Sequence, residues 1–278
     1  MSVIPKVQRP KSRRMTALTV AGNVQLSPSF RRVTMGGEGL ADLDYVGFDQ
    51  AVRLSFPRDG QTQLRMPTVS NDAWLGQFLL QSKSRRPWVR NYTIRRFRPG
   101  DSEIDIDFVR HGAANHDHAA VAGPASEWAE HAQSGDPVGI FDEGYTYLPP
   151  SDAQWHLLVG EESAVPAILS ILECVPDDLR AEVFLEVPLA SDIPEKVYAP
   201  KSAQIHWIVR DDPGEVPGTQ LLGEMKDASL PGGRFYTWVA GEHKLPTGLR
   251  RHLVNDRGIP KSDITFGGYW RDGKSSPG

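Results

Sequence analysis

The chain of 278 residues is nearly devoid of cysteine. Cys174 stands alone, which excludes an internal disulfide and an iron–sulfur cluster held by the protein, and fits a reducing compartment. Cys174 falls within an apolar helical pattern, and this pattern predicts a buried thiol without a chemical role.

Long apolar runs are also absent. No stretch approaches the roughly 18 residues of a membrane span. The basic residues between Lys6 and Arg14 are not followed by the apolar core of a signal peptide, so residues 1–15 are expected to form a flexible basic arm. We expect a cytoplasmic protein, monomeric and without stable membrane association. The net charge of −4 argues against a dedicated nucleic-acid binder.

Two familiar ligand signatures are missing as well. The glycine-rich dinucleotide fingerprint Gly-x-Gly-x-x-Gly does not follow any predicted buried strand. His116, Asp117 and His118 lie in a loop flanked by alanine and glycine, and no other residues complete a ligand set around them. The sequence therefore predicts no protein-bound metal.

Short β-rich segments fill the first half of the chain. They are separated by glycine, proline or aspartate turns and span residues 16–27, 30–36, 51–58, 88–97, 103–111 and 136–141. Together with one helix at 125–133, they predict a small antiparallel β-barrel over residues 16–149. Residues 59–87 form a long polar insertion with a short helix near 71–81, and loops of this length are usually functional or disordered.

The second half alternates strands with helices. Strands are expected at 155–159, 181–187, 205–209, 235–240 and 264–269, and helices at 163–174, 219–228 and 248–256. This alternation predicts a doubly wound parallel sheet over residues 150–278. Pro149 and Pro150 interrupt both patterns and mark the predicted boundary.

The segment 90–97, RNYTIRRF, carries the strongest chemical signal. On an extended strand Arg90 and Tyr92 point the same way, about 7 Å apart. Arginine binds phosphate oxygens bidentately, and a tyrosine ring offers a flat surface for stacking. Alone, the motif could equally be a solvated strand with an incidental arginine.

A second phosphate site is predicted downstream, at Gly123, Ala125 and Ser126. These residues lie where a turn opens into a helix, whose first N–H groups bind phosphate, and Ser126 could cap the helix. Trp128 either packs near an adenine or fills the end of the barrel. Two phosphate sites and an aromatic shelf favour a dinucleotide, and the shelf favours a flavin.

These motifs resemble those of the siderophore-interacting, ferric-siderophore reductase family within the ferredoxin-reductase-like superfamily. The resemblance rests on the Arg-x-Tyr-Thr strand and on the segments 107–112, 123–128, 159–168 and 268–271, in this order. It runs from about residue 16 to residue 273. It implies an FAD-binding barrel followed by an NAD(P)H-binding α/β domain. In such proteins a reduced nicotinamide passes hydride to FAD, and electrons then reduce siderophore-bound Fe(III) to Fe(II), which releases the iron.

The resemblance also implies roles for individual residues. Arg90 would contact the FAD pyrophosphate, Tyr92 would pack on the isoalloxazine, and Thr93 would approach the ring nitrogen that accepts hydride. Tyr92 and Thr93 are thus the expected catalytic positions. Further cofactor-binding positions are Asp107, Val109, His111, Gly112, Gly123, Ala125, Ser126 and Trp128 in the barrel, and Gly160, Glu162, Ser163 and Trp270 in the second half.

The nicotinamide pocket is expected where Gly160 to Pro166 match the family's Gly-[acid]-x-[Thr/Ser]-Ala-x-Pro turn. This turn does not distinguish NADH from NADPH, and Arg210, followed by two aspartates, is an ambiguous 2′-phosphate ligand. The substrate cleft would open beside the last helix, with Lys244, Arg250 and Arg271 binding an anionic ferric siderophore. These cations could equally be a solvated surface.

Four alternatives remain at this level. The basic and aromatic residues between 83 and 98 also suit a nucleic-acid-binding barrel. A siderophore carrier could hold flavin or substrate without turnover. Within the enzymes, a general flavin or ferric reductase is possible, and so is electron supply from ferredoxin.

Overall fold

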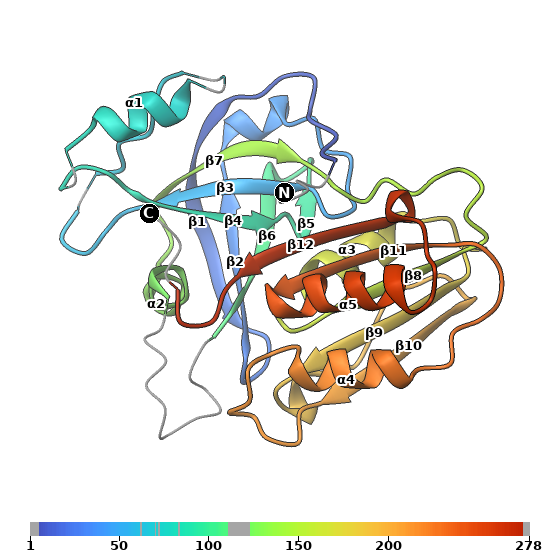
Figure 1. The fold of residues 1–278 in the computed structure, drawn as a ribbon. Helices are drawn as coiled ribbons and strands as arrows, with labels where there is room; N and C mark the ends of the chain where they lie inside the picture. Colours follow the sequence, from blue (N-terminus) through green and yellow to red (C-terminus); the bar gives the residue numbers. More distant parts are fainter. Residues whose placement is uncertain are drawn as a thin grey trace. The chain divides into compact units, whose positions relative to one another are not determined.

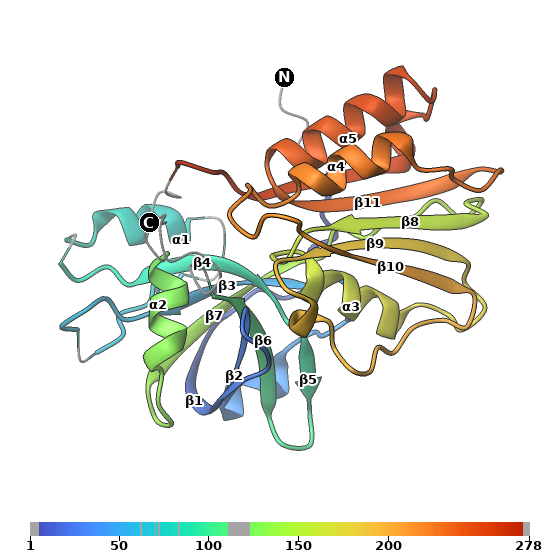
Figure 2. The same ribbon diagram turned by 90° about the horizontal axis from the view of Figure 1, so that it is seen from below.

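The computed structural model describes residues 6–61, 63–69, 71, 73–82, 84–110 and 123–274 (Figures 1 and 2). The chain forms two compact units, one of residues 7–110 with 123–145 and the other of residues 146–274. The first is built on a seven-stranded antiparallel sheet and the second on a five-stranded parallel sheet. The predicted fold class is confirmed.

The strands of the antiparallel sheet are ordered β4-β3-β7-β1-β2-β6-β5. Their bounds are β1 Met15–Gln25, β2 Phe30–Gly36, β3 Ala51–Phe56, β4 Trp88–Thr93, β5 Arg96–Arg98, β6 Glu103–Val109 and β7 Pro137–Gly144. A 3₁₀ turn at Glu38–Asp42 follows β2.

The predicted strand 88–97 is in fact two strands, β4 and β5, which lie at opposite edges of the sheet. Between them, the amide of Ile94 donates to the carbonyl of Gln50 at 2.9 Å and that of Arg95 to the carbonyl of Asp105 at 2.8 Å. The chain thereby changes partner from the β3 side to β6. This exchange joins the two edges and rolls the sheet into a half-barrel.

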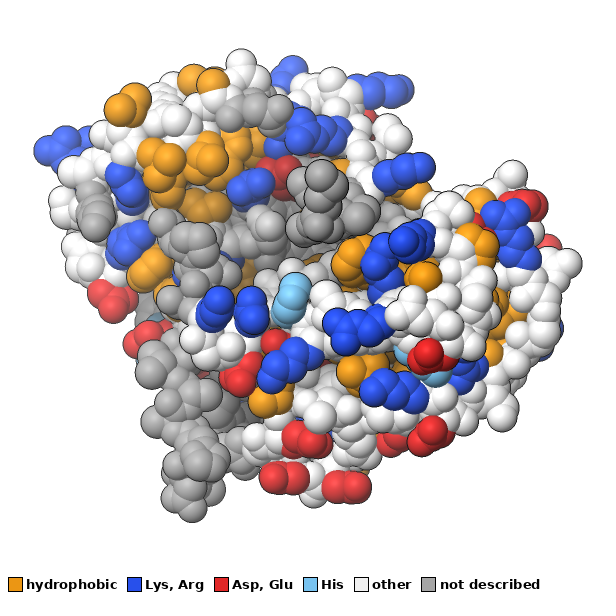
Figure 3. Space-filling model, in the orientation of Figure 1, with side chains coloured by type: hydrophobic (Ala, Val, Ile, Leu, Met, Phe, Trp, Pro, Cys, Tyr) orange, Lys and Arg blue, Asp and Glu red, His pale blue; other side chains and the backbone are white. Residues whose placement is uncertain are grey.

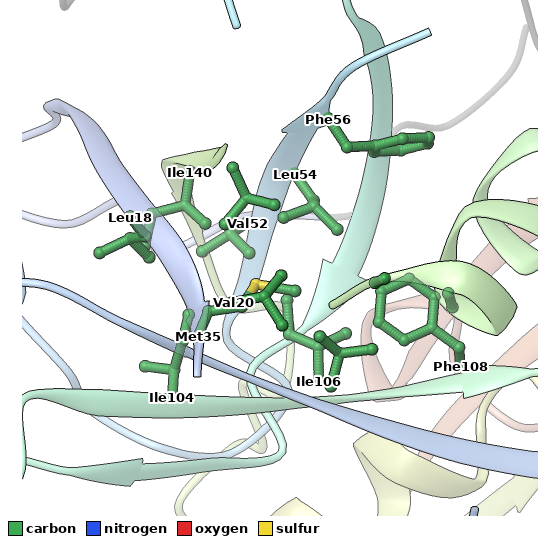
Figure 4. Packing of buried hydrophobic residues seen from close by; sticks show 14 of the residues in the cluster. Leu18, Val20, Met35, Val52, Leu54, Phe56, Ile104, Ile106, Phe108 and Ile140 are labelled. Atoms are coloured by element: carbon green, nitrogen blue, oxygen red, sulfur yellow. The ribbon is translucent and has the colours of Figure 1, made fainter. Parts of the chain in front are cut away.

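Alternate residues of each barrel strand form the core (Figure 4). On β6, Ile104, Ile106 and Phe108 are fully buried, as the alternation of apolar and polar residues predicts. Val52 and Leu54 of β3 meet them from the facing side of the barrel. Burial of such side chains stabilises a fold by about 1.5–3 kcal/mol each.

The insertion between β3 and β4 is anchored on the outside of the barrel. Its helix α1, Trp74–Leu80, confirms the predicted short helix. Trp74 and Phe78 lie one turn apart and pack with Phe141 of β7, the Trp74 and Phe141 ring centroids being 5.9 Å apart. Met66 packs directly against the backbone of Gly139. A Cβ at residue 139 would lie 1.7 Å from the Met66 sulfur. The insertion therefore needs a glycine at that point of β7.

The parallel sheet has the order β10-β9-β8-β11-β12. Its strands are β8 Trp155–Gly160, β9 Ala181–Val187, β10 Ala203–Val209, β11 Phe235–Glu242 and β12 Ile264–Trp270. Helix α3, Val165–Cys174, covers one face, and α4, Thr219–Asp227, and α5, Lys244–Asn255, cover the other (Figure 2). Short 3₁₀ turns occupy Ala190–Asp192 and Lys261–Asp263.

Two sequence-based expectations are wrong in this unit. Helix α5 begins at Lys244 rather than at residue 248, because Pro246 falls in its first turn, where proline is tolerated. Cys174 is exposed rather than buried. It is the last residue of α3, so no further helical turn follows to cover it.

Candidate functional site

Arg90 lies in the middle of β4 with a half-buried guanidinium. Its Nη1 donates to the carbonyl of Val89 at 2.7 Å, and its Cζ lies 5.1 Å from the centroid of the Trp88 ring. Burial lowers the pKa of Arg90; Tyr92 opposes this shift, and the cation of Arg58 adds to it. The position is electropositive and presents the planar fork that binds phosphate.

Tyr92 begins a row of aromatic rings that crosses the barrel end. Its ring centroid lies 4.4 Å from that of Phe108, which lies 5.8 Å from Trp128, which in turn lies 5.1 Å from Phe56. The contacts of Trp128 favour the barrel-filling alternative. Burial raises the pKa of Tyr92, so its hydroxyl stays protonated near neutrality. Thr93 ends β4 and is half-buried.

Helix α2, Pro124–His131, supplies the second predicted phosphate site and contacts β2, β4 and β6. Gly123 is its N-cap, and the amide of Glu127 donates to the carbonyl of Gly123 at 3.1 Å. Ser126 is the third helical residue and is buried with Ala125, so the prediction that it caps the helix is wrong. The N-terminus of α2 remains a site of the kind that binds anions.

The other predicted barrel positions have mixed surroundings. Both carboxylate oxygens of Asp107 accept hydrogen bonds from Arg32, at 2.7 and 2.8 Å, so this side chain holds β6 to β2. Val109 ends β6 opposite Phe30. His111 and Gly112 lie outside the described residues.

In the second unit, the Glu161 carboxyl accepts hydrogen bonds from residues at the carboxyl ends of β8, β11 and β12. Its Oε2 accepts from the amide of Ser163 at 2.8 Å. Its Oε1 accepts from the Ser163 hydroxyl, from the amide of Glu242 at 2.9 Å and from Nε1 of Trp270 at 3.0 Å. Two predicted cofactor positions, Ser163 and Trp270, are thus brought together by one buried carboxyl.

Burial raises the pKa of Glu161, and the negative charge of Glu162 raises it further. The hydrogen bonds from Ser163 and Trp270 oppose the shift. Glycines make room for this carboxyl: a Cβ on Gly241 would lie 2.7 Å from Oε1 of Glu161. A Cβ on Gly160 would lie 2.6 Å from the Cβ of Ala164, so Gly160 allows α3 to approach β8.

Glu162 points to a different set of partners. Its oxygens accept from Nη1 and Nη2 of Arg210 at 2.6 and 2.8 Å, and Nη1 also donates to Glu186 at 2.8 Å. All three side chains are buried. Glu186 additionally accepts from the amides of Gly218 and Leu221 at the start of α4. Arg210 is therefore committed to an internal ion triad, and a direct cofactor contact of Glu162 stays a prediction.

Buried Glu242 holds the backbone of one predicted substrate residue, Lys244, and that of Asp272, the neighbour of another, Arg271. Its carboxylate accepts from the amide of Lys244 at 2.6 Å and from that of Asp272 at 3.2 Å. Lys244, at the start of α5, and Arg271, after β12, are both exposed. Arg250 lies farther along α5, with its Cζ 4.8 Å from the centroid of the Phe266 ring. Lys244 and Arg271 thus follow the carboxyl ends of the neighbouring strands β11 and β12, whereas Arg250 lies on the flank of α5.

Two family models match the chain in succession. Residues 19–146 match the siderophore-interacting FAD-binding domain, and residues 153–273 match the siderophore-interacting protein model. The chain belongs to the siderophore-interacting protein family. This assignment confirms the resemblance inferred from the motifs, and it confirms FAD as the cofactor for which the barrel is built.

Members of this family align with nearly the whole chain. Ferric vibriobactin reductase ViuB of Vibrio cholerae is 31% identical over 257 residues, which cover 90% of this chain and 87% of ViuB. A siderophore utilization protein from T. fusca superposes with a TM-score of 0.81, 30% identity and 99% of both chains covered. The siderophore-interacting protein SipS of Aeromonas hydrophila gives a TM-score of 0.74, with 29% identity and 96% and 94% coverage.

The sequence did not reveal the residues that hold the predicted site residues in place. The Gly-Glu-Glu-Ser turn was recognised, but a role was expected for Glu162 rather than for Glu161. Glu242 was not singled out, although an acidic residue at the end of a buried strand next to a glycine is a usable signal. Phe108 was seen only as part of a motif, whereas it links Tyr92 to α2.

Within the part of the chain that the structure describes, no helix has the length and apolar character to cross a membrane. The same residues contain no group of three or more His, Cys, Asp or Glu side chains placed to hold a metal ion. His116, Asp117 and His118 lie outside the described residues.

Proposed function

We propose that this member of the siderophore-interacting family is an FAD-dependent ferric-siderophore reductase that takes hydride from NAD(P)H. The observation that carries the proposal is the joining of both phosphate motifs within one unit. Arg90 and Tyr92 on β4 are connected to α2 through the rings of Phe108 and Trp128. A half-buried guanidinium, a helix N-terminus and an aromatic shelf are the donors and the surface that a flavin dinucleotide requires.

The residues of the barrel fit FAD. Arg90 would bind pyrophosphate oxygens, since an anion there would offset the burial of its guanidinium and the repulsion from the cation of Arg58. The first turn of α2, from Gly123 to Ser126, would bind phosphate through backbone N–H groups. Tyr92 and Thr93 would lie against the ring system. Bound FAD would accept two electrons as a hydride and pass them on one at a time.

The nicotinamide would enter at the carboxyl ends of the parallel strands, where ligands bind in open α/β sheets. Glu161 holds the Ser163 hydroxyl and the Trp270 indole in fixed orientations. Ser163 and Trp270 would then border the nicotinamide. Residues 16–149 and 150–278 are the proposed FAD and NAD(P)H domains.

The substrate would be an anionic ferric siderophore. Hard oxygen ligands hold Fe(III) more tightly than Fe(II), so reduction releases the iron without any ligand from the protein. Lys244 and Arg271 would attract the complex electrostatically, with Arg250 on the flank of α5. ViuB is named a ferric vibriobactin reductase, which supports this substrate class. We propose a monomer acting in the cytoplasm.

Anaerobic stopped-flow spectroscopy tests the proposal. NADH, NADPH and reduced ferredoxin are each mixed with the FAD-loaded protein, and the reduced protein is then mixed with catecholate or hydroxamate iron complexes. The expected result is bleaching of the flavin by a nicotinamide and recovery of its absorption on adding a ferric siderophore. If only reduced ferredoxin bleaches the flavin, ferredoxin rather than a nicotinamide is the electron donor. If no iron complex restores the flavin absorption, the protein is a siderophore carrier or a general flavin reductase.

A further inference from the structure

The insertion between β3 and β4 exposes leucines on a firmly anchored helix. Leu75 and Leu79 lie one turn apart on α1 and are 46% and 53% exposed, and Leu80 at its end is 89% exposed. No residue of α1 is charged. Trp74 and Phe78 are buried on the opposite side. The leucines therefore face outward on a fixed support, an arrangement that marks an interaction surface.

Arginines surround these leucines. Arg65 and Arg85 are exposed, and Arg86 donates from Nε to the carbonyl of Gln81 at 2.8 Å at the end of α1. Burial lowers the pKa of Arg58, and the nearby cation of Arg86 lowers it further. Among the described residues, none of these four arginines forms an ion pair with a carboxylate. Figure 3 shows hydrophobic side chains over α1 with Lys and Arg side chains around them.

The charge of this segment is opposite to that of the whole chain. Residues 58–90 contain six basic and two acidic residues, whereas the chain has a net charge of −4. The insertion thus carries a net positive charge on a protein whose overall charge is negative. It is therefore attracted to negatively charged surfaces.

A cavity beside Leu80 combines both properties. It has a volume of about 770 Å³ and is lined by Leu64, Arg65, Met66, Leu80, Gln81 and Arg85, among others. Guanidinium groups bind phosphate oxygens bidentately, and the leucine and methionine side chains offer contact to the adjoining carbon chain. A phosphate that carries an apolar tail matches both halves of this lining.

We propose that Leu75, Leu79, Leu80, Arg65 and Arg85, the leucine–arginine surface, dock reversibly on an anionic lipid bilayer. The leucines enter the boundary between head groups and acyl chains, and the arginines bind lipid phosphates. A folded protein partner would need a carboxylate fixed opposite each arginine, whereas a bilayer supplies phosphates at any spacing. The absence of a spanning segment does not conflict with such a contact, because peripheral docking needs only a local apolar surface.

Vesicle co-sedimentation with the FAD-loaded full chain tests this proposal. Vesicles of phosphatidylcholine, with and without phosphatidylglycerol, are compared at low and high ionic strength. We expect sedimentation only with phosphatidylglycerol, weakened by salt. Arg65→Ser with Arg85→Ser should weaken binding about 30-fold, since each basic residue near an anionic surface contributes about 1 kcal/mol. Replacing all three leucines with serine should weaken it at least about tenfold.

Matched controls change equally exposed residues elsewhere. Val24→Ser with Leu26→Ser, both about half exposed on or next to β1, should sediment as the wild type does. The same is expected of Arg180→Ser with Lys201→Ser. No sedimentation of the wild type at low salt, or full binding by both surface variants, would overturn the proposal. Binding to native membranes but not to protein-free vesicles of the same lipids would assign the surface to a protein partner instead.

Discussion

Replacing Arg210 with methionine should destabilise the α/β unit strongly. The change removes three charge-assisted hydrogen bonds and leaves the carboxylates of Glu162 and Glu186 buried without their cation. Removing one partner of a buried ion pair typically costs about 3–5 kcal/mol. The unit has about 130 residues, for which this loss corresponds to a fall in Tm on the order of 10–20 °C.

Thermal unfolding followed by tryptophan fluorescence measures this effect, because Trp155 and Trp238 are buried in the same unit. Arg14→Met is the matched control: Arg14 pairs with Asp42 at the surface, with both side chains more than half exposed, and such pairs contribute at most about 1 kcal/mol. A Tm of Arg210→Met within about 2 °C of the wild type would refute the reasoning. A selective loss of NADPH use at unchanged Tm would make Arg210 a 2′-phosphate ligand.

Further predictions concern the cofactor, the donor, the substrate and pH. Arg90→Ala should weaken FAD binding about tenfold to a hundredfold in a fluorescence titration, because a charge-assisted phosphate contact of about 1.5–3 kcal/mol is lost. Ser163→Trp should slow flavin reduction by NAD(P)H, while dithionite reduces the flavin as before. Reversing the charges of Lys244 and Arg250 together should raise the KM for an anionic ferric siderophore on the order of tenfold at low ionic strength, and less in high salt. Burial lowers the pKa of His156 to about 4, so stability contributed by its neutral form should be lost as pH falls from about 6.5 towards 4.

Controls separate these effects from general damage. Arg96→Ala, at an exposed residue of β5, should keep wild-type FAD affinity. Ser163→Ala should slow hydride transfer less than the bulky variant does. Normal flavin reduction by NAD(P)H is required of the Lys244/Arg250 variant, and an unchanged KM at low salt would remove both residues from the substrate site. His156→Gln should flatten the stability profile below pH about 6.5; an unaltered profile would assign the acid sensitivity to other groups.

Local patterns predicted the elements of both units well because their periods are clear. On β6, apolar residues at every second position match the buried side of the barrel from Ile104 to Phe108. The break at Ile94 and Arg95 escaped prediction, because it depends on pairing with Gln50 and Asp105, which are distant in sequence. The helix expected from residue 248 begins at Lys244, because Pro246 falls in its first turn, where proline is tolerated.

The site itself was only partly predictable. Arg90, Tyr92 and Ser163 carry recognisable chemistry at recognisable spacings. Glu161 and Glu162 are adjacent and chemically identical in sequence, and only the bend after β8 directs one towards Trp270 and the other towards Arg210. No local sequence pattern specifies which glutamate takes which role.

The stoichiometry of the reaction tests the central claim most directly. Under strictly anaerobic conditions the FAD-loaded protein is given a limiting amount of NADH or NADPH and an excess of ferric siderophore, with a chromogenic chelator to trap ferrous iron. The account predicts about two ferrous ions for each nicotinamide oxidised, because one hydride carries two electrons. Nicotinamide oxidation without ferrous iron, or ferrous iron formed equally by free FAD without the protein, would contradict it.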